Sequence, residues 1–283
     1  MIQDGIRRVR WRRGSLALIA VGVVTGVAAG LYGTYSFLLY TKQRGILFPA
    51  KLNPRRPDSL TRWIETPQAR VETRWFPAQG DTTGMAAVFF HGNKEVVDHW
   101  PLSVAAWNRR GVGVLLVEYP GYGNSTGAGP TQKTIREASV AAWDWLVAQP
   151  GVNPRRVFAA GRSLGGGVAC DLATFRPVAG LFLQSTFASV RATAMARYKV
   201  PGFLVRDPFD NVAVVRTFPG PILAMQGTND RTIPFENLGK LQEAAPGGRY
   251  VVFPNHGHST IPGPDTLLYW SAIDSFLTQV RAR

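Results

Sequence analysis

A Gly-x-Ser-x-Gly motif, Gly161 to Gly165, lies between a short apolar run and a helix-like segment. A serine at such a strand-to-helix corner has strained backbone and projects its hydroxyl from the edge of a sheet. The two glycines omit Cβ atoms that would collide with the neighbouring strand or helix. Ser163 is therefore a candidate nucleophile for acyl transfer, and the alternative is a glycine-rich turn without chemistry.

A serine hydroxyl is a poor nucleophile and needs a base, for which the chain offers four histidines. We predict that His258 is the base because it follows a glycine in a loop after the last predicted strand; His256 is the alternative. Asp230, just past another buried strand, is the predicted acid that orients the imidazole, unless it only forms a turn beside Asn229. The chain order Ser163, Asp230, His258 suits a hydrolase triad.

Acyl transfer also requires hydrogen-bond donors for the oxyanion that develops in the transition state. The backbone amide of Leu164, which follows the nucleophile, is one predicted donor. The second is expected from the loop His91-Gly92-Asn93 that follows an apolar strand, with Asn93 presenting its amide. His91 is then expected to hold this loop and not to act as the base.

Short apolar runs alternate with amphipathic segments, which predicts an α/β fold with a mostly parallel central sheet covered by helices on both faces. We assign the globular domain to 71–283, with a small cap at 188–218. The predicted strands include 85–90, 113–118, 156–160, 178–183, 221–225 and 249–253, and the predicted helices include 100–109, 131–148 and 265–281.

The N-terminal region combines a basic tail, 1–14, with an uncharged apolar run, 15–40. The run is long enough to cross a membrane, and the arginine-rich tail should stay cytoplasmic, which places the domain on the outer side. A cleavable signal peptide is the alternative. A proline- and arginine-rich connector, 41–70, follows. Three glycines spaced four apart could allow self-association of the helix: Gly22, Gly26 and Gly30.

Composition excludes several other classes of protein. The formal net charge is +14, but the basic residues are scattered outside the tail, so a nucleic-acid partner is not expected. Cys170 is the single cysteine, which rules out an internal disulfide and a cysteine-based metal site; it is expected to be a small buried residue. No metal or other cofactor is expected.

Five sequence blocks together resemble the α/β-hydrolase superfamily. More narrowly they are similar to its membrane-anchored small-cap branch of serine aminopeptidase-like and acyl-protein thioesterase-like hydrolases. The resemblance implies metal-independent hydrolysis through an acyl-enzyme. Lys94-Glu95-Val96 and Ser259 depart from the usual pattern, in which small residues and an acidic or amide residue occupy these places. The blocks are 91–93, 118–125, 161–166, 227–230 and 257–258.

The bond that is cleaved stays open, because ester, thioester and N-terminal peptide bonds all fit this triad. A catalytically silent binding or scaffold protein with the same fold, located at the membrane, is the alternative function. The cap contains apolar side chains such as Met195 and Phe203. They could favour a hydrophobic acyl group, or they could simply pack the cap onto the domain.

Overall fold

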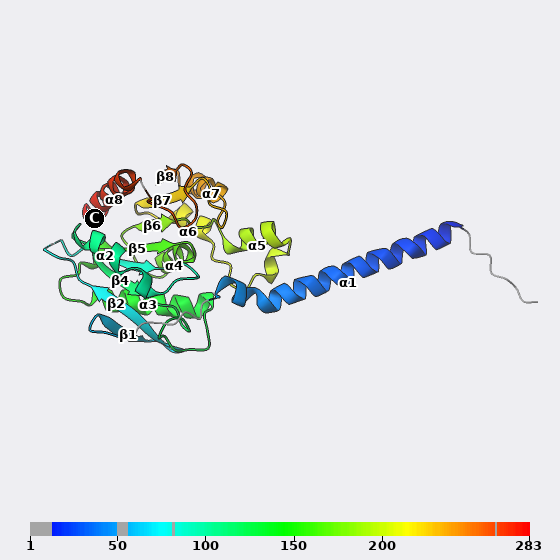
Figure 1. The fold of residues 1–283 in the computed structure, drawn as a ribbon, viewed down its shortest axis with the longest axis horizontal. Helices are drawn as coiled ribbons and strands as arrows, with labels where there is room; N and C mark the ends of the chain where they lie inside the picture. Colours follow the sequence, from blue (N-terminus) through cyan, green and yellow to red (C-terminus); the bar gives the residue numbers. More distant parts are fainter. Residues whose placement is uncertain (1–12, 50–55, 81–82, 264) are drawn as a thin grey trace, which may run out of the picture. The chain divides into compact units, whose positions relative to one another are not determined.

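Figure 1 shows a computed structural model of the chain, which describes residues 13–49, 56–80, 83–263 and 265–283. The chain divides into two compact units, Met1–Gln43 and Arg44–Arg283. The predicted basic tail, 1–14, falls almost wholly outside the described residues.

The described residues of the first unit belong to helix α1, Arg13–Leu47. From Leu16 to Leu47 this helix is long and apolar enough to cross a membrane, with a mean hydropathy of 2.0. It extends beyond Tyr40, where the predicted span 15–40 ends. A Cβ atom at Gly22, Gly26 or Gly30 would meet no atom within 4 Å. Self-association along these glycines stays a prediction.

Within the described residues of the second unit, eight strands form one sheet in the order β1-β2-β4-β3-β5-β6-β7-β8. Strand β2 pairs antiparallel with β1 and β4, and all the other neighbours are parallel. The strands are β1 Thr61–Glu65, β2 Arg70–Phe76, β3 Ala86–Phe90, β4 Gly113–Val117, β5 Val157–Arg162, β6 Leu181–Gln184, β7 Ile222–Gly227 and β8 Arg249–Phe253.

Helices cover both faces of the sheet, as Figure 1 illustrates. Val88 and Phe90 of β3 belong to a core cluster with side chains from α3, α4, α6 and α7, whereas Ala87 and Phe89 join a second cluster with α2 and α8. The predicted parallel sheet with helices on both faces is thereby confirmed. The helices are α2 Pro101–Asn108, α3 Gln132–Val147, α4 Leu164–Ala173, α5 Val190–Tyr198, α6 Asn211–Thr217, α7 Glu236–Ala244, α8 Thr266–Arg281 and the short 3-10 helices η1 Val97–His99, η2 Pro154–Arg156 and η3 Gly202–Leu204.

Two segments differ from the sequence-based expectation. The predicted connector, 41–70, contains the edge strand β1, in which only Ile64 is buried. The predicted cap, 188–218, consists of α5, η3 and α6, but α6 contributes the buried Val215 to the core. Helices α5 and η3 carry no buried residue, and only the half-buried Val190 at the start of α5 packs against the core.

The corner between β5 and α4 is the tightest approach in the fold. Ser163 adopts φ 54° and ψ −117°, a strained conformation for a residue with a side chain. A Cβ atom at Gly161 would overlap the carbonyl oxygen of Gly165, and one at Gly165 would overlap the carbonyl oxygen of Phe90. The end of β3, the end of β5 and the start of α4 can therefore meet only because both motif glycines lack side chains.

Replacing Gly165 by alanine should force β3 and α4 apart. We expect Gly165→Ala to lower the free energy of unfolding by about 1–3 kcal/mol, as overpacking does. Chemical denaturation of the full chain in detergent, followed by circular dichroism, measures the change. Gly239→Ala is the matched control, because Gly239 is exposed in α7 and a Cβ there meets no atom within 4 Å. The control should be neutral or stabilising, and equal stabilities of both variants and wild type would contradict the close approach.

Candidate active site

The serine of the motif is fixed at the carboxyl edge of the sheet by its backbone. Its amide donates to the carbonyl oxygen of Gln184 at 2.9 Å, and its carbonyl oxygen accepts from Oγ1 of Thr186 at 2.8 Å. Both partners lie at the end of the neighbouring strand β6 and directly after it. The Ser163 residue is only 7% exposed, so its hydroxyl has a defined position beside the loops that follow the strands.

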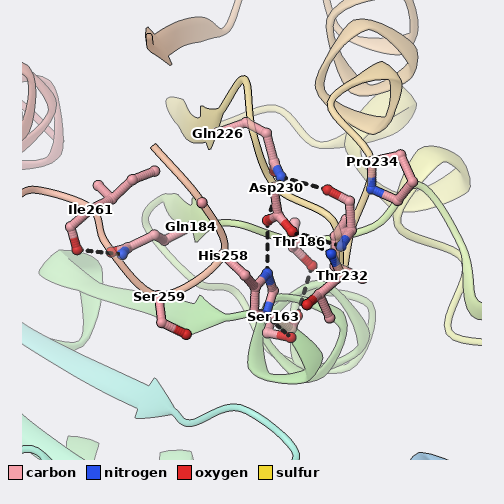
Figure 2. Close-up of polar contacts among 12 residues, drawn as sticks. Ser163, Gln184, Thr186, Gln226, Asp230, Thr232, Pro234, His258, Ser259 and Ile261 are labelled. Atoms are coloured by element: carbon pink, nitrogen blue, oxygen red, sulfur yellow. Dashed lines mark hydrogen bonds and ion pairs between the residues drawn. The ribbon is translucent and has the colours of Figure 1, made fainter. Parts of the chain in front are cut away.

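His258 and Asp230 complete a hydrogen-bonded line with this serine, as Figure 2 shows. The Nε2 atom of His258 lies 3.0 Å from Oγ of Ser163, and its Nδ1 atom lies 2.7 Å from Oδ2 of Asp230. A carboxylate can only accept, so Nδ1 carries the hydrogen and Nε2 is left as the acceptor for the serine hydroxyl. The structure thus brings together the three residues predicted as nucleophile, base and acid.

Asp230 is held by three further donors, one from β7 and two from the loop that follows it. Its Oδ2 accepts from Nε2 of Gln226 at 2.8 Å, and its Oδ1 accepts from the amides of Thr232 and Ile233, each at 2.8 Å. The residue is 5% exposed. These donors fix the orientation of the carboxylate toward the imidazole. Sequence analysis missed Gln226, since an amide four residues before an aspartate carries no recognisable pattern.

His256, the alternative base, contacts groups other than the serine. Its Nδ1 atom lies 2.8 Å from the carbonyl oxygen of Pro254, and its Nε2 atom lies 3.2 Å from that of Pro262. The residue is 7% exposed and packs edge-on against Phe253. Its contacts are those of a side chain that ties the loop after β8 together.

His91 is buried and paired with a carboxylate. Its Nε2 atom lies 2.6 Å from Oε1 of Glu118, and its Nδ1 atom lies 2.8 Å from the carbonyl oxygen of Gly92. The hydroxyl of Tyr119 donates to the carbonyl oxygen of His91 at 2.6 Å, and burial raises the pKa of this phenol. This network anchors the loop after β3 to the end of β4, which is the holding role expected for His91.

The loop after β3 and the start of α4 contain the residues predicted to bind an oxyanion. Leu164 is the first residue of α4, directly after Ser163. The Gly92 amide donates to Oε2 of Glu95 at 2.7 Å, so it is engaged within the loop. The side-chain amide of Asn93 donates to the carbonyl oxygen of Leu47 at 3.2 Å, and the Asn93 carbonyl accepts from the hydroxyl of Tyr122. The backbone amide of Asn93 is therefore the hydrogen-bond donor of this loop that could bind the oxyanion.

Arg162, the variable residue of the motif, is a member of the site that sequence analysis did not identify. It forms an ion pair with Glu95 and contacts the loop that carries His258. Burial lowers the pKa of its guanidinium. No local signal could have revealed these partners, because both lie far from Arg162 in the sequence.

The described residues offer neither a metal site nor a reactive thiol. In the described part of the chain, no cluster of three or more His, Cys, Asp or Glu side chains is arranged to hold a metal ion. The thiol of Cys170 is buried in α4, and burial raises its pKa well above the usual value, which makes it a poor nucleophile.

Comparisons with known proteins agree with this architecture. No family model matches the chain. An uncharacterized protein of Mycobacterium tuberculosis is 30% identical over 272 residues, which cover 93% of this chain and 95% of that protein. The alpha/beta hydrolase domain-containing protein WAV2 of Arabidopsis thaliana is 26% identical over 252 residues, covering 81% of this chain and 80% of that protein.

A solved structure has the same fold as this chain. An esterase of Pyrococcus furiosus superposes with a TM-score of 0.61 at 18% identity, covering 80% of this chain and 97% of that one. The strand order, the serine corner and these similarities together show that the chain belongs to the α/β-hydrolase superfamily.

Proposed function

We propose that this chain is a membrane-anchored serine hydrolase that cleaves an ester, thioester or amide bond through an acyl-enzyme. The observation that carries the proposal is the continuous line from Oγ of Ser163 through the His258 imidazole to the Asp230 carboxylate. Such a line supplies a nucleophile, a base and the group that stabilises the resulting imidazolium.

In the first half of the reaction, Oγ of Ser163 attacks the carbonyl carbon while Nε2 of His258 takes the hydroxyl proton. Asp230 accepts the hydrogen bond from Nδ1 and stabilises the imidazolium. When the tetrahedral intermediate collapses, the bond to the leaving group breaks and His258 returns the proton to that group. A water molecule then attacks the acyl-enzyme by the same steps and restores Ser163.

The oxyanion of each tetrahedral intermediate would be bound by the backbone amides of Leu164 and Asn93. Both amides belong to rigid elements, the start of α4 and the loop fixed by the pair of His91 and Glu118. Fixed donors need no reorganisation when charge develops, and each contributes about 2.7–4 kcal/mol to transition-state stabilisation in comparable enzymes.

The apolar helix supports membrane attachment. By the positive-inside tendency, the arginine-rich tail stays cytoplasmic and the hydrolase domain lies on the opposite side. The length and apolar character of α1 support the crossing of a membrane, whereas the proposed orientation rests on the arginine-rich tail.

The exposed surface of the cap supports a hydrophobic substrate. Phe203 is 85% exposed and Met195 is 47% exposed, so these two side chains do not pack the cap onto the domain. Large apolar side chains that face solvent next to basic ones suit an amphipathic partner such as an acyl chain with an anionic end. We therefore propose a hydrophobic acyl group over a free amino acid.

The triad predicts that catalysis depends on His258 and not on the neighbouring His256. Ser163→Ala and His258→Ala should each lower kcat by roughly 10⁴-fold or more, because they remove the nucleophile or its base. His256→Ala removes contacts with the loop after β8 and with Phe253 but none with Ser163, so it should retain most of the activity. Hydrolysis of p-nitrophenyl esters of increasing acyl length by the detergent-solubilised full chain measures this, with unfolding curves to verify each fold. Loss of activity in His256→Ala alone would contradict the assignment. A folded wild type that cleaves no ester or amide would instead indicate a binding protein.

The proposed topology predicts the accessibility of an introduced cysteine. Leu267 is 89% exposed in α8, whereas the single native cysteine, Cys170, is buried. In intact cells, Leu267→Cys should therefore react with a membrane-impermeant maleimide and wild type should not. Reaction only after permeabilisation would reverse the orientation, and recovery of the protein in the soluble fraction would contradict anchoring.

A further inference from the structure

Arg162 lies between two loops that each carry a departure from the superfamily pattern. On one side its Nη1 atom forms an ion pair with Oε1 of Glu95. On the other side its Nη2 atom donates to the carbonyl oxygen of His258 at 3.2 Å and to Oγ of Ser259 at 2.6 Å. The two unusual residues, Glu95 and Ser259, therefore share one partner.

The geometry of this contact requires the planar fork of an arginine. One guanidinium nitrogen faces the loop after β3 and the other faces the loop after β8. The side chains of Arg162 and Glu95 are only 11% and 17% exposed, so solvent screens their attraction weakly. A lysine would place a single ammonium where two separate nitrogens are used.

The second oxygen of Glu95 extends the contact to the proposed oxyanion site. Its Oε2 atom accepts from the Gly92 amide at 2.7 Å, and the Glu95 amide donates back to the Gly92 carbonyl at 3.2 Å. Asn93, whose amide is the proposed donor, lies within this turn. The carboxylate thus sets the position of the turn and pairs with Arg162 at the same time.

We propose that Glu95, Arg162 and Ser259 form a positioning bridge that sets three parts of the active site in register. The bridge joins the oxyanion loop after β3, the serine corner after β5 and the base loop after β8. None of its members has to touch the substrate. The inference rests on the proposed serine hydrolase function and adds residues that hold its geometry.

Each end of the bridge lies within two residues of a reacting group. Arg162 directly precedes Ser163, Ser259 directly follows His258, and Glu95 lies two residues after Asn93. If the bridge is broken, the two loops can shift relative to the serine corner. Because a misplacement of about 1 Å can cost roughly 10²-fold in rate, the loss should appear in kcat.

The experiment compares variants of the bridge in the full chain. Arg162→Gln and Glu95→Gln should each lower kcat by roughly 10- to 100-fold and change KM much less, because binding of the ground state does not depend on loop register. Arg162→Lys keeps the positive charge but not the planar fork, and its kcat should fall about as far as that of Arg162→Gln. The double variant of Arg162→Gln and Glu95→Gln should have a kcat no lower than that of either single variant, because each substitution alone already breaks the contact between the two side chains.

A second ion pair of similar form provides the matched control. Arg176, which lies three residues after the end of α4, donates two hydrogen bonds of 2.7 Å to the carboxylate of Asp144 in α3, away from the serine corner. Arg176→Gln and Asp144→Asn should leave kcat unchanged. Should Arg162→Gln fail to fold, Ser259→Ala removes only an exposed hydroxyl and should still lower kcat.

Three results would overturn the bridge. They are wild-type kcat in Arg162→Gln, full activity in Arg162→Lys, and strictly additive losses in the double variant. A wild-type protein that hydrolyses nothing would instead contradict the proposed function itself, so the two failures can be distinguished.

Discussion

The close approach of three backbones at the serine corner is the constraint on which the rest of the site depends. Gly165 lies against the carbonyl of Phe90, and Gly161 lies against Gly165 itself. A side chain at Gly165 would separate β3 from α4, and one at Gly161 would separate β5 from α4. This contact places the nucleophile and the oxyanion loop at one edge of the sheet, and it accounts for the positive φ of Ser163.

Parallel pairing of the strands brings Asp230 and His258 to the same edge of the sheet as Ser163. Strands β3, β5, β6, β7 and β8 are parallel neighbours in that order, so the loops that follow them lie side by side. Asp230 follows β7 and His258 follows β8; His258 contacts Ser163, and Asp230 contacts the far side of the His258 imidazole. Gln184 at the end of β6 and Thr186 in the loop after it form hydrogen bonds with the backbone of Ser163.

The parts of the fold that were predictable from sequence are those with local signals. Fully buried parallel strands such as β3 and β4 appear as continuous apolar runs, and the glycines of the serine corner mark a tight turn. Strand β1 was not predicted because it is an edge strand whose residues are mostly polar. The partners of His91, Asp230 and Arg162 were not predictable, because polar side chains that pair over long sequence distances produce no periodic pattern in the sequence.

Covalent trapping of the nucleophile tests the central claim most directly. The full chain in detergent would be treated with a fluorophosphonate, digested and analysed by mass spectrometry. The account predicts one phosphonyl adduct, located on Ser163, whose formation slows sharply when His258 is replaced by alanine. An adduct on a different residue, or none on a folded wild-type protein that does hydrolyse esters, would contradict it.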